Sequence, residues 1–344
     1  MRITALVLAL VGCGLDPVDD LAVGQSELAA CPKFGCGGDN SPIISGAYFH
    51  DLNRAGLPND VGIRIAGFRD QWGNPYALRV SHGRISGVAG NVVISGQQLV
   101  GAQIVVTLAG ARYSITIEEV ITVPYWVASA AKLEAYKLSY YDWRTPLRIV
   151  PLCSNPQPES PDNLTMANGL AFYTLVFEGD RIDDLYKTVA PDSTGQWFNL
   201  GCAGSAPAKM ALTGHTYAAQ FDKLVTTVAE RQTILKMFTA DYCNDGTPYT
   251  VAGQPLTWAD GNKWMQMLPD VTTLEARWTP DGAACVGVPR AAVPNTPAAA
   301  AFPTIKSAAD ITTLCKNTSG KDVPACDDTT LALDGFHLAS ANRK

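Results

Sequence analysis

The sequence has little charge, few histidines and no long apolar run after its first residues. Only 17% of its 344 residues are charged, against 47% that are hydrophobic, and it has four histidines. The formal net charge is −6 and the basic residues form no cluster, which argues against nucleic acid as a partner because phosphate neutralisation supplies most of that affinity. The composition is that of a globular chain, and no later segment has the unbroken apolar length of a membrane helix.

The sequence patterns of common catalytic sites are also missing. We find no Gly-x-Ser-x-Gly elbow, no His-Glu-x-x-His, no phosphate-binding loop and no dinucleotide-binding glycine motif. The segment from Asp241 begins like a calcium loop, but its third position is Cys243 and its twelfth is Ala252, so the set of ligands fails. We therefore predict neither a metal ion nor a cofactor.

The first residues have the pattern of an export signal. The apolar run Ile3–Val11 is followed by Gly12 and Cys13. This run is too short for a hydrocarbon core of about 30 Å but suits a signal peptide, and a small residue before a cysteine is typical of a lipobox. We predict a signal peptide over 1–12, lipidation of Cys13 and a tether over 13–40, which would place the protein in the cell envelope, held to a membrane by its lipid anchor only. The alternative is an ordinary cysteine beside a conventional cleavage site.

Cysteine usage indicates an oxidising compartment. Of nine cysteines, eight remain after Cys13, and an even number of exported cysteines favours disulfides. Cys31 and Cys36 resemble half of a metal site, but no second cysteine or histidine pair stands at a suitable spacing. We predict structural disulfides that use Cys31, Cys36, Cys153, Cys202, Cys243, Cys285, Cys315 and Cys326.

Most of the chain up to residue 200 reads as short strands. Runs rich in Val, Ile and Tyr alternate with turn residues. Such closely spaced strands favour an antiparallel β-sandwich or a barrel-like body, predicted over 41–200, because an antiparallel sheet must bury one face. The predicted strands are Val61–Ala66, Tyr76–Val80, Val92–Ser95, Ile104–Leu108, Tyr113–Ile121, Ala135–Tyr141, Leu147–Leu152, Leu170–Phe177 and Trp197–Leu200.

The hydrophobic period then changes, which predicts a smaller α+β part. Over Phe221–Tyr242, apolar residues recur every three or four positions, the pattern of an amphipathic helix that the turn residues Asn244–Gly246 would end. We predict a segment of one helix plus strands over 201–290. A Pro/Ala-rich linker follows from Pro289 to Pro303, and a short helix near Ser307–Leu314 leads into a disulfide-closed tail, so that linker and tail fill 291–344.

An aromatic-rich stretch is the best candidate for recognition. Exposed rings can stack on sugars or anchor a protein partner. Its candidates are Tyr125, Trp126, Tyr141 and Trp143. The alternation between Tyr136 and Tyr140 also suits core-facing strand positions, and the core interpretation is favoured.

The helix is predicted to end in a motif that carries a family resemblance. The motif is Ala240-Asp241-Tyr242-Cys243, followed by Asn-Asp-Gly. Together with Trp197–Cys202, Lys209 and the stretch Glu275–Cys285, it resembles the ADYC domain family of exported proteins, chiefly from myxobacteria. Similarity spans roughly Gly87 to Cys326 and is strongest from Trp197 to Arg290. The resemblance implies an architecture and no reaction.

We interpret the motif as a structural corner. A cysteine at a helix end can tie the helix to a strand, Tyr242 can pack its ring while its hydroxyl finds a partner, and Asp241 can accept hydrogen bonds from backbone N–H groups. The catalytic alternative makes Asp241 an acid or base, or Cys243 a nucleophile. Motif context and proximity predict the pairs Cys31–Cys36, Cys315–Cys326, Cys243–Cys285 and Cys153–Cys202.

The resemblance also implies a departure from the family pattern. Met210 and Ile234 stand where many members carry two further cysteines. We expect both apolar side chains to be buried and to touch across the interface between the helix and the sheet.

The predicted function is that of a non-enzymatic envelope lipoprotein that binds a protein or glycan partner or has a structural role. The alternative is an envelope hydrolase, for which Asp241, His215 and Glu275 would have to converge with a nucleophile around one cleft. Two other groups are interpreted as exposed: the pair His50 and Asp51, and a solvated turn that contains Asp180, Asp183 and Asp184.

Overall fold

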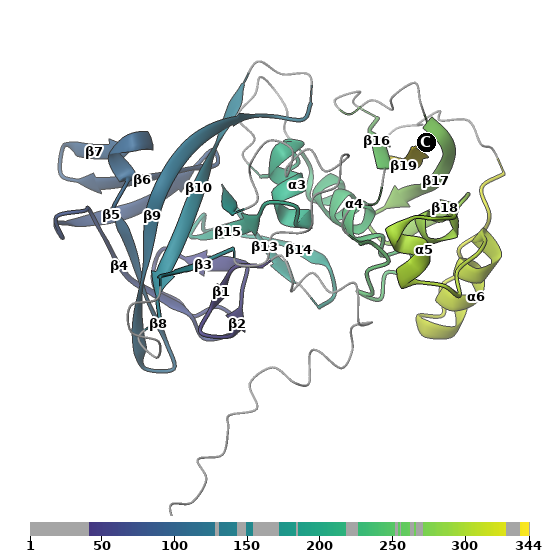
Figure 1. Ribbon diagram of the computed structural model, residues 1–344, viewed down its shortest axis with the longest axis horizontal. Helices are drawn as coiled ribbons and strands as arrows, with labels where there is room; N and C mark the ends of the chain where they lie inside the picture. Colours follow the sequence, from purple (N-terminus) through teal and green to yellow (C-terminus); the bar gives the residue numbers. More distant parts are fainter. Residues whose placement is uncertain are drawn as a thin grey trace, which may run out of the picture.

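The protein, studied as a computed structural model, is built mainly from antiparallel β-strands (Figure 1). The structure describes residues 41–127, 131–142, 149–153, 172–183, 185–217, 226–251, 254, 256–261, 265, 271–327 and 338–343. The predicted signal peptide, Cys13, the tether over 13–40, and the pair Cys31 and Cys36 lie outside these residues. Among the helices that the structure describes, none is both long and apolar enough to cross a membrane.

The largest element is a sheet of 11 strands in the order β3-β15-β12-β10-β9-β8-β4-β5-β6-β7, with β11 paired to β10. All of its pairs are antiparallel, and each strand predicted from the sequence overlaps one of its members, so the predicted β-rich body is confirmed. The strands are β3 (Asp51–Asn53), β4 (Arg64–Arg69), β5 (Pro75–Ser81), β6 (Arg84–Ala89), β7 (Val92–Ser95), β8 (Gln103–Leu108), β9 (Ala111–Pro124), β10 (Lys132–Tyr141), β11 (Ile149–Pro151), β12 (Tyr173–Glu178) and β15 (Trp197–Cys202), with the short helix η2 (Gly96–Leu99) after β7.

This sheet curls over its own core but stays open, with β3 and β7 at its edges. The turn between β5 and β6 rests on the middle of the sheet: the Gly83 N–H donates to Glu178 Oε2 at 3.2 Å, and the Ile85 N–H donates to the Tyr136 hydroxyl oxygen at 2.7 Å. The enclosed core contains fully buried side chains from strands along the whole sheet, among them Ile85, Ile104, Ile115, Tyr136 and Phe198. The body is therefore barrel-like without being a closed barrel.

The strand β12 is buried on both faces. Leu175 and Phe177 belong to a second core on the outer side of the sheet, whereas Val176 between them belongs to the enclosed core. Successive side chains of a strand point to opposite faces. Because β12 lies between the two cores, its sequence is a continuous run of apolar residues. Helices α3 (Ala206–Leu212) and α4 (Val228–Thr239) lie on the outer side of the long sheet (Figure 1).

The second core continues into a four-stranded sheet in the order β16-β19-β17-β18. Its strands are β16 (Leu256–Ala259), β17 (Val271–Thr279), β18 (Gly282–Val286) and β19 (Leu338–Arg343). Helix α4 packs against β17, β18 and β19. This core contains residues from Val123 to Leu338, so it extends across the predicted boundary at residue 200.

The Pro/Ala-rich segment is folded, and its interpretation as a linker was wrong. It forms η3 (Arg290–Ala292) and α5 (Pro297–Ala301), and it contributes Ala298 and Phe302 to the second core. Alanine favours helix, and the Thr296 hydroxyl oxygen caps α5 by accepting from the Ala299 N–H at 3.2 Å. The helix predicted near Ser307–Leu314 is present as α6 (Ala308–Thr318).

Two small hairpins complete the fold: β1 (Ile43–Ile44) with β2 (Ala47–Tyr48), and β13 (Asp180–Asp183) with β14 (Thr188–Pro191). The second contradicts the prediction of a solvated turn, because Asp180 is fully buried. Its carboxylate accepts from Arg231 of α4 at 2.6 Å and 3.0 Å. The Asp183 carboxylate accepts two backbone N–H groups of the turn that follows, and Asp184 lies outside the described residues.

The pair His50 and Asp51 is likewise buried rather than exposed. Asp51 accepts from Arg181 Nε at 2.6 Å, and Arg181 also reaches the exposed Asp60 at 2.9 Å. Burial raises the pKa of Asp51, and the nearby Arg181 charge only partly opposes it. Asp51 and Asp180 therefore form ion pairs with arginines that are distant in sequence. Their local sequence suggests exposure because it does not contain these partners.

Candidate functional site

The ADYC motif begins where α4 ends. Thr227 and Glu230 form a capping box at the start of this helix. Its C-cap is Ala240, in the left-handed conformation with φ of 54°, which is uncommon for a residue with a side chain. The helix is therefore shorter at both ends than the predicted Phe221–Tyr242, and it stops before the Asn-Asp-Gly turn that was expected to end it.

Asp241 lies directly after this turn and is fully buried. Its Oδ2 accepts from Lys236 Nζ at 2.6 Å and from the Gly246 N–H at 3.1 Å, and its Oδ1 accepts from the Asp245 N–H at 3.1 Å. Lys236, also fully buried, donates in addition to the backbone oxygen of Tyr186 at 2.8 Å. The expected role of Asp241 as an acceptor of backbone N–H groups is confirmed, and its charge is matched inside the protein.

Tyr242 packs its ring and satisfies its hydroxyl, as predicted. The ring stacks on Trp278 of β17 with centroids 5.2 Å apart and contacts Tyr249 at 5.9 Å. The hydroxyl donates to Glu275 Oε1 at 2.6 Å. Burial, together with the negative charge of Glu275, raises the pKa of Tyr242 well above its ordinary value, so this phenol stays protonated and acts as a donor.

Glu275 is shared with Arg290, and both are buried. The guanidinium donates through Nε to Glu275 Oε1 and through Nη2 to Oε2 at 2.9 Å, so the pair is bidentate. Arg290 also donates to Thr250 Oγ1 at 2.8 Å and to the backbone oxygen of Met237, near the end of α4, at 3.2 Å. Burial alone would lower the pKa of Arg290, but the charge of Glu275 outweighs it and raises that pKa.

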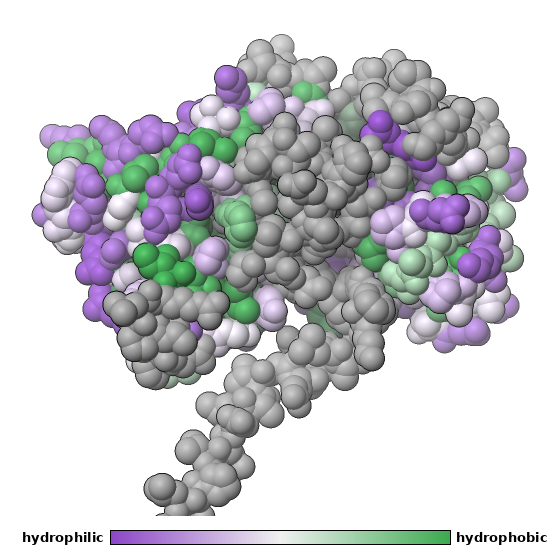
Figure 2. All heavy atoms as spheres, in the orientation of Figure 1, coloured by the Kyte–Doolittle hydropathy of each residue, from purple (hydrophilic) through white to green (hydrophobic). Residues whose placement is uncertain are grey.

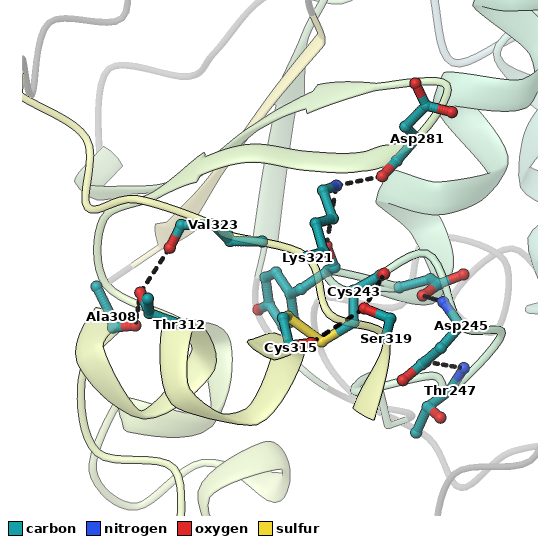
Figure 3. The surroundings of a disulfide bond; sticks show 12 residues. Cys243, Asp245, Thr247, Asp281, Ala308, Thr312, Cys315, Ser319, Lys321 and Val323 are labelled. Atoms are coloured by element: carbon teal, nitrogen blue, oxygen red, sulfur yellow. Dashed lines mark hydrogen bonds between the residues drawn. A yellow bond between two sulfur atoms is a disulfide. The ribbon is translucent and has the colours of Figure 1, made fainter. Parts of the chain in front are cut away.

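Cys243 ties the motif to α6 rather than to a strand (Figure 3). Its disulfide to Cys315 joins Cα atoms 4.8 Å apart, and Ser319 Oγ donates to the Cys243 backbone oxygen at 2.9 Å. Lys321 on the following segment donates to the backbone oxygens of Asp281 and Tyr242. Helix α6 and the segment after it are thereby fastened to the corner that the motif forms.

The predicted pairs of Cys243 with Cys285 and of Cys315 with Cys326 are therefore wrong. Cys285 of β18 pairs with Cys326, and the segment before Cys326 lies beside β18 through a parallel bridge between Val286 and Ala325. The prediction of Cys153 with Cys202 is confirmed. The two wrong pairs were predicted from proximity in sequence. In the structure, α6 packs against the motif at Cys243, whereas the segment that follows α6 lies against β18, so the neighbouring cysteines have different partners.

The three residues named for a hydrolase have separate partners. Asp241 is paired with Lys236 and Glu275 with Arg290. The His215 ring lies 3.1 Å from two oxygens of Thr213, with Nε2 3.9 Å from Asp260 Oδ2. Burial lowers the pKa of His215, although Asp260 and Glu230 oppose that shift. Within the described part of the chain, no group of three or more His, Cys, Asp or Glu side chains could hold a metal ion.

The aromatic candidates for recognition divide into buried and exposed rings. Tyr125 is buried in the second core, which contradicts a role as an exposed ring, and Trp126 is partly buried and stacks on Trp258 at 6.1 Å. Tyr141 is 47% exposed, and Trp143 lies outside the described residues. The core interpretation of Tyr136 and Tyr140 is confirmed, since both are buried in the enclosed core.

Met210 of α3 and Ile234 of α4 are fully buried in the same core, and their helices pack against each other. The interface between them is therefore between two helices rather than between a helix and the sheet. Apolar burial at these positions agrees with the expectation drawn from the family pattern.

Lys209, which belongs to the stretch that resembles the family, has an unusual environment. It lies on α3, and no acidic side chain of the described residues pairs with it. Burial, and secondarily the like charge of Arg290, lower the pKa of Lys209 to about 8. The signal in the sequence was weak, because a single lysine on a seven-residue helix reads as a solvated side chain.

Taken together, these features define an antiparallel β-protein with disulfide bonds. Its motif forms the turn that ends α4, and the polar side chains of that motif have partners inside the protein. The family model for the ADYC domain matches residues 96–292, from η2 to η3. The chain therefore belongs to the ADYC domain family. This match includes β8 to β15 of the long sheet as well as the motif. No curated protein and no solved structure matches the chain.

We predict that Asp241→Asn lowers the free energy of unfolding by about 3–5 kcal/mol, because it leaves the buried charge of Lys236 without a counter-charge. The double variant Lys236→Met/Asp241→Asn should lose less than the sum of the two single losses. Urea unfolding measures all three, with the exposed Asp322→Asn as the neutral control. A loss below about 1 kcal/mol for Asp241→Asn would contradict a closed buried pair.

We further predict that Lys209→Met stabilises the protein at neutral pH by on the order of 1 kcal/mol, discounted for the partial exposure of this side chain. The folded pKa of about 8 lies below the ordinary value, so the unfolded state binds more protons between these two values. Stability of the parent should therefore rise with pH in this window, and the advantage of Lys209→Met should shrink. Urea unfolding at several pH values tests this, with Lys316→Met on the exposed face of α6 as control. An advantage independent of pH would refute it.

Proposed function

We propose that this protein is an exported lipoprotein of the cell envelope, anchored through Cys13, that binds a protein or glycan partner and has no catalytic centre in its ADYC motif. The observation that carries the proposal is that the polar groups of the motif are satisfied internally. Asp241 is matched by Lys236, and Tyr242 and Arg290 share Glu275. A catalytic acid or base must be free to exchange a proton with a substrate.

Three disulfides among the described residues support export. Disulfides form and persist outside the reducing cytosol. Each of these three joins segments at least 41 residues apart, and closing long loops of this kind stabilises a fold by about 2–4 kcal/mol per bridge. These features fit a protein that works in an oxidising compartment.

Anchorage is tested by substituting the lipobox cysteine. We expect Cys13→Ala to abolish incorporation of radiolabelled palmitate and to release the protein from membranes into the soluble fraction, because the lipid is the only proposed anchor. Cys31→Ala, also near the N-terminus, serves as the matched control and should remain labelled. Equal labelling of the Cys13→Ala variant and the parent would refute lipidation at this position.

Partner binding is tested at Tyr141, the one predicted recognition residue that the structure shows to be exposed. A photo-reactive phenylalanine analogue at position 141 should yield a discrete cross-linked adduct in intact cells. The same analogue in place of Tyr186, a 57% exposed tyrosine after β13, is the matched control and should yield none. Mass spectrometry of the adduct identifies a protein or a glycan. Equal adducts at both positions, or none at 141, would contradict this recognition surface.

A further inference from the structure

One part of the long sheet is positively charged although the protein as a whole is acidic. Residues 61–117, which include β4 to β8 and the first half of β9, contain five arginines, one aspartate, no lysine and no glutamate. Their formal charge is +4, so the rest of a chain with net charge −6 carries −10. The aspartate, Asp70, accepts from the backbone N–H groups of Trp72 and Asn74 in its own turn, and the next acid, Glu118, accepts from the Ser139 hydroxyl.

Strand pairing brings arginines that are dispersed in the sequence onto one face. Arg64 of β4 lies opposite Thr107 of β8, which in turn lies opposite Arg112 of β9. The residue that follows each of these three packs against the enclosed core. Because successive side chains of a strand point to opposite faces, all three point outward, and two strand spacings of about 10 Å in total separate the two arginines.

Arg69, farther along β4, belongs to the same outward face. Its Nε donates to Gln103 Oε1 at 2.9 Å and its Nη2 donates to Ser114 Oγ at 3.2 Å. These partners are neutral, and neither Arg64 nor Arg112 forms an ion pair with a carboxylate of the described residues. Arg64 and Arg112 are exposed and Arg69 is partly exposed. Three positive charges therefore face solvent without a counter-charge in the part of the chain that the structure describes.

An aromatic ring lies on this face as well. Tyr140 of β10 lies opposite Ile115 of β9, and both side chains are in the enclosed core. The next residues on the two strands, Tyr141 and Ser114, therefore point outward. Tyr141 is 47% exposed, and Ile149 of β11, which lies opposite it, is 66% exposed. Ser114, the partner of Arg69, thus lies between the arginines and the ring.

We propose that this face, formed by Arg64, Arg69, Arg112 and Tyr141, binds an acidic polysaccharide whose sugars are uronic acids. The guanidinium groups bind the carboxylates of the polymer, whose planar geometry they match. The ring of Tyr141 stacks on the face of a sugar. The inference rests on the proposed binding role and decides between its two partner classes, protein and glycan.

The polar character of the face favours a glycan over an acidic protein segment. The centre of a protein interface is depleted of charged residues, whereas charged residues are spread across this face. On the side of the molecule shown in Figure 2, hydrophilic residues cover much of the part that the long sheet forms, with apolar patches between them. Partly exposed side chains among the arginines can both donate and accept hydrogen bonds, as sugar hydroxyls do. They are Gln103, Thr107, Ser114 and Thr116.

The test uses the full chain with Cys13→Ala and follows binding of three polyuronates, polygalacturonate, alginate and hyaluronate, by biolayer interferometry. We expect saturable binding of at least one of them and no binding of dextran, a neutral polysaccharide. Binding should weaken as ionic strength rises, because salt screens exposed charges. The double variant Arg64→Gln/Arg112→Gln should lower the affinity about tenfold or more, the loss expected when at least one charge-assisted hydrogen bond is removed.

Matched variants separate the site from the overall charge. Lys306→Gln/Lys316→Gln removes two exposed positive charges on and beside α6 and should leave the affinity unchanged. Tyr141→Ala should weaken binding about two- to tenfold through the loss of stacking, whereas Tyr141→Phe, which keeps the ring, should bind like the parent. Circular dichroism and thermal melting check that every variant is folded.

Two probes without sugars represent the other possible partners. Poly-L-glutamate carries the carboxylates of an acidic protein segment, and phosphatidylglycerol vesicles carry anionic headgroups. Binding of either probe as tight as that of the polyuronates would overturn the glycan site. So would the absence of saturable polyuronate binding, or equal affinity in the parent and the arginine double variant. A protein cross-linked from position 141 without polyuronate binding would refute the glycan and leave the proposed partner binding intact, so the two failures are distinguishable.

Discussion

The bidentate pair of Arg290 and Glu275 is the interaction on which the C-terminal half of the structure depends. The guanidinium binds a carboxylate on β17, the hydroxyl of Thr250 and a carbonyl oxygen near the end of α4. A pair of this kind adds little net stability over apolar packing, because both charges lose their hydration. It does penalise every arrangement that separates them, so it fixes how the helix meets the four-stranded sheet.

The motif residues serve this arrangement in different ways. Ala240 turns the chain out of the helix, Asp241 neutralises the lysine buried on the helix, and Tyr242 completes the hydrogen bonding of Glu275. Gly282 is equally constrained, because a Cβ there would lie 2.7 Å from the backbone oxygen of Asp241. Three of the four motif residues thus form the end of one helix and its contacts with the sheet, and the fourth, Cys243, is bonded to α6.

Much of the fold could be predicted because strand periodicity is a local property. The strands of the body and the roles of Asp241 and Tyr242 followed from patterns a few residues long. What could not be predicted involves distant segments: the sheet β16–β19, the arginines that bury Asp51 and Asp180, and the position of α6 against Cys243.

The disulfide pattern has a consequence for how the protein matures. Cys315 and Cys326 are close in sequence but bind different partners, Cys243 and Cys285. Short loops close far more readily than long ones in an unfolded chain, so fast oxidation would first join the wrong neighbours. Escape requires thiol–disulfide exchange, which proceeds over minutes to hours without a catalyst. Formation of the native pairs therefore depends on thiol–disulfide exchange after the first oxidation, and on the thiol redox balance under which the chain folds.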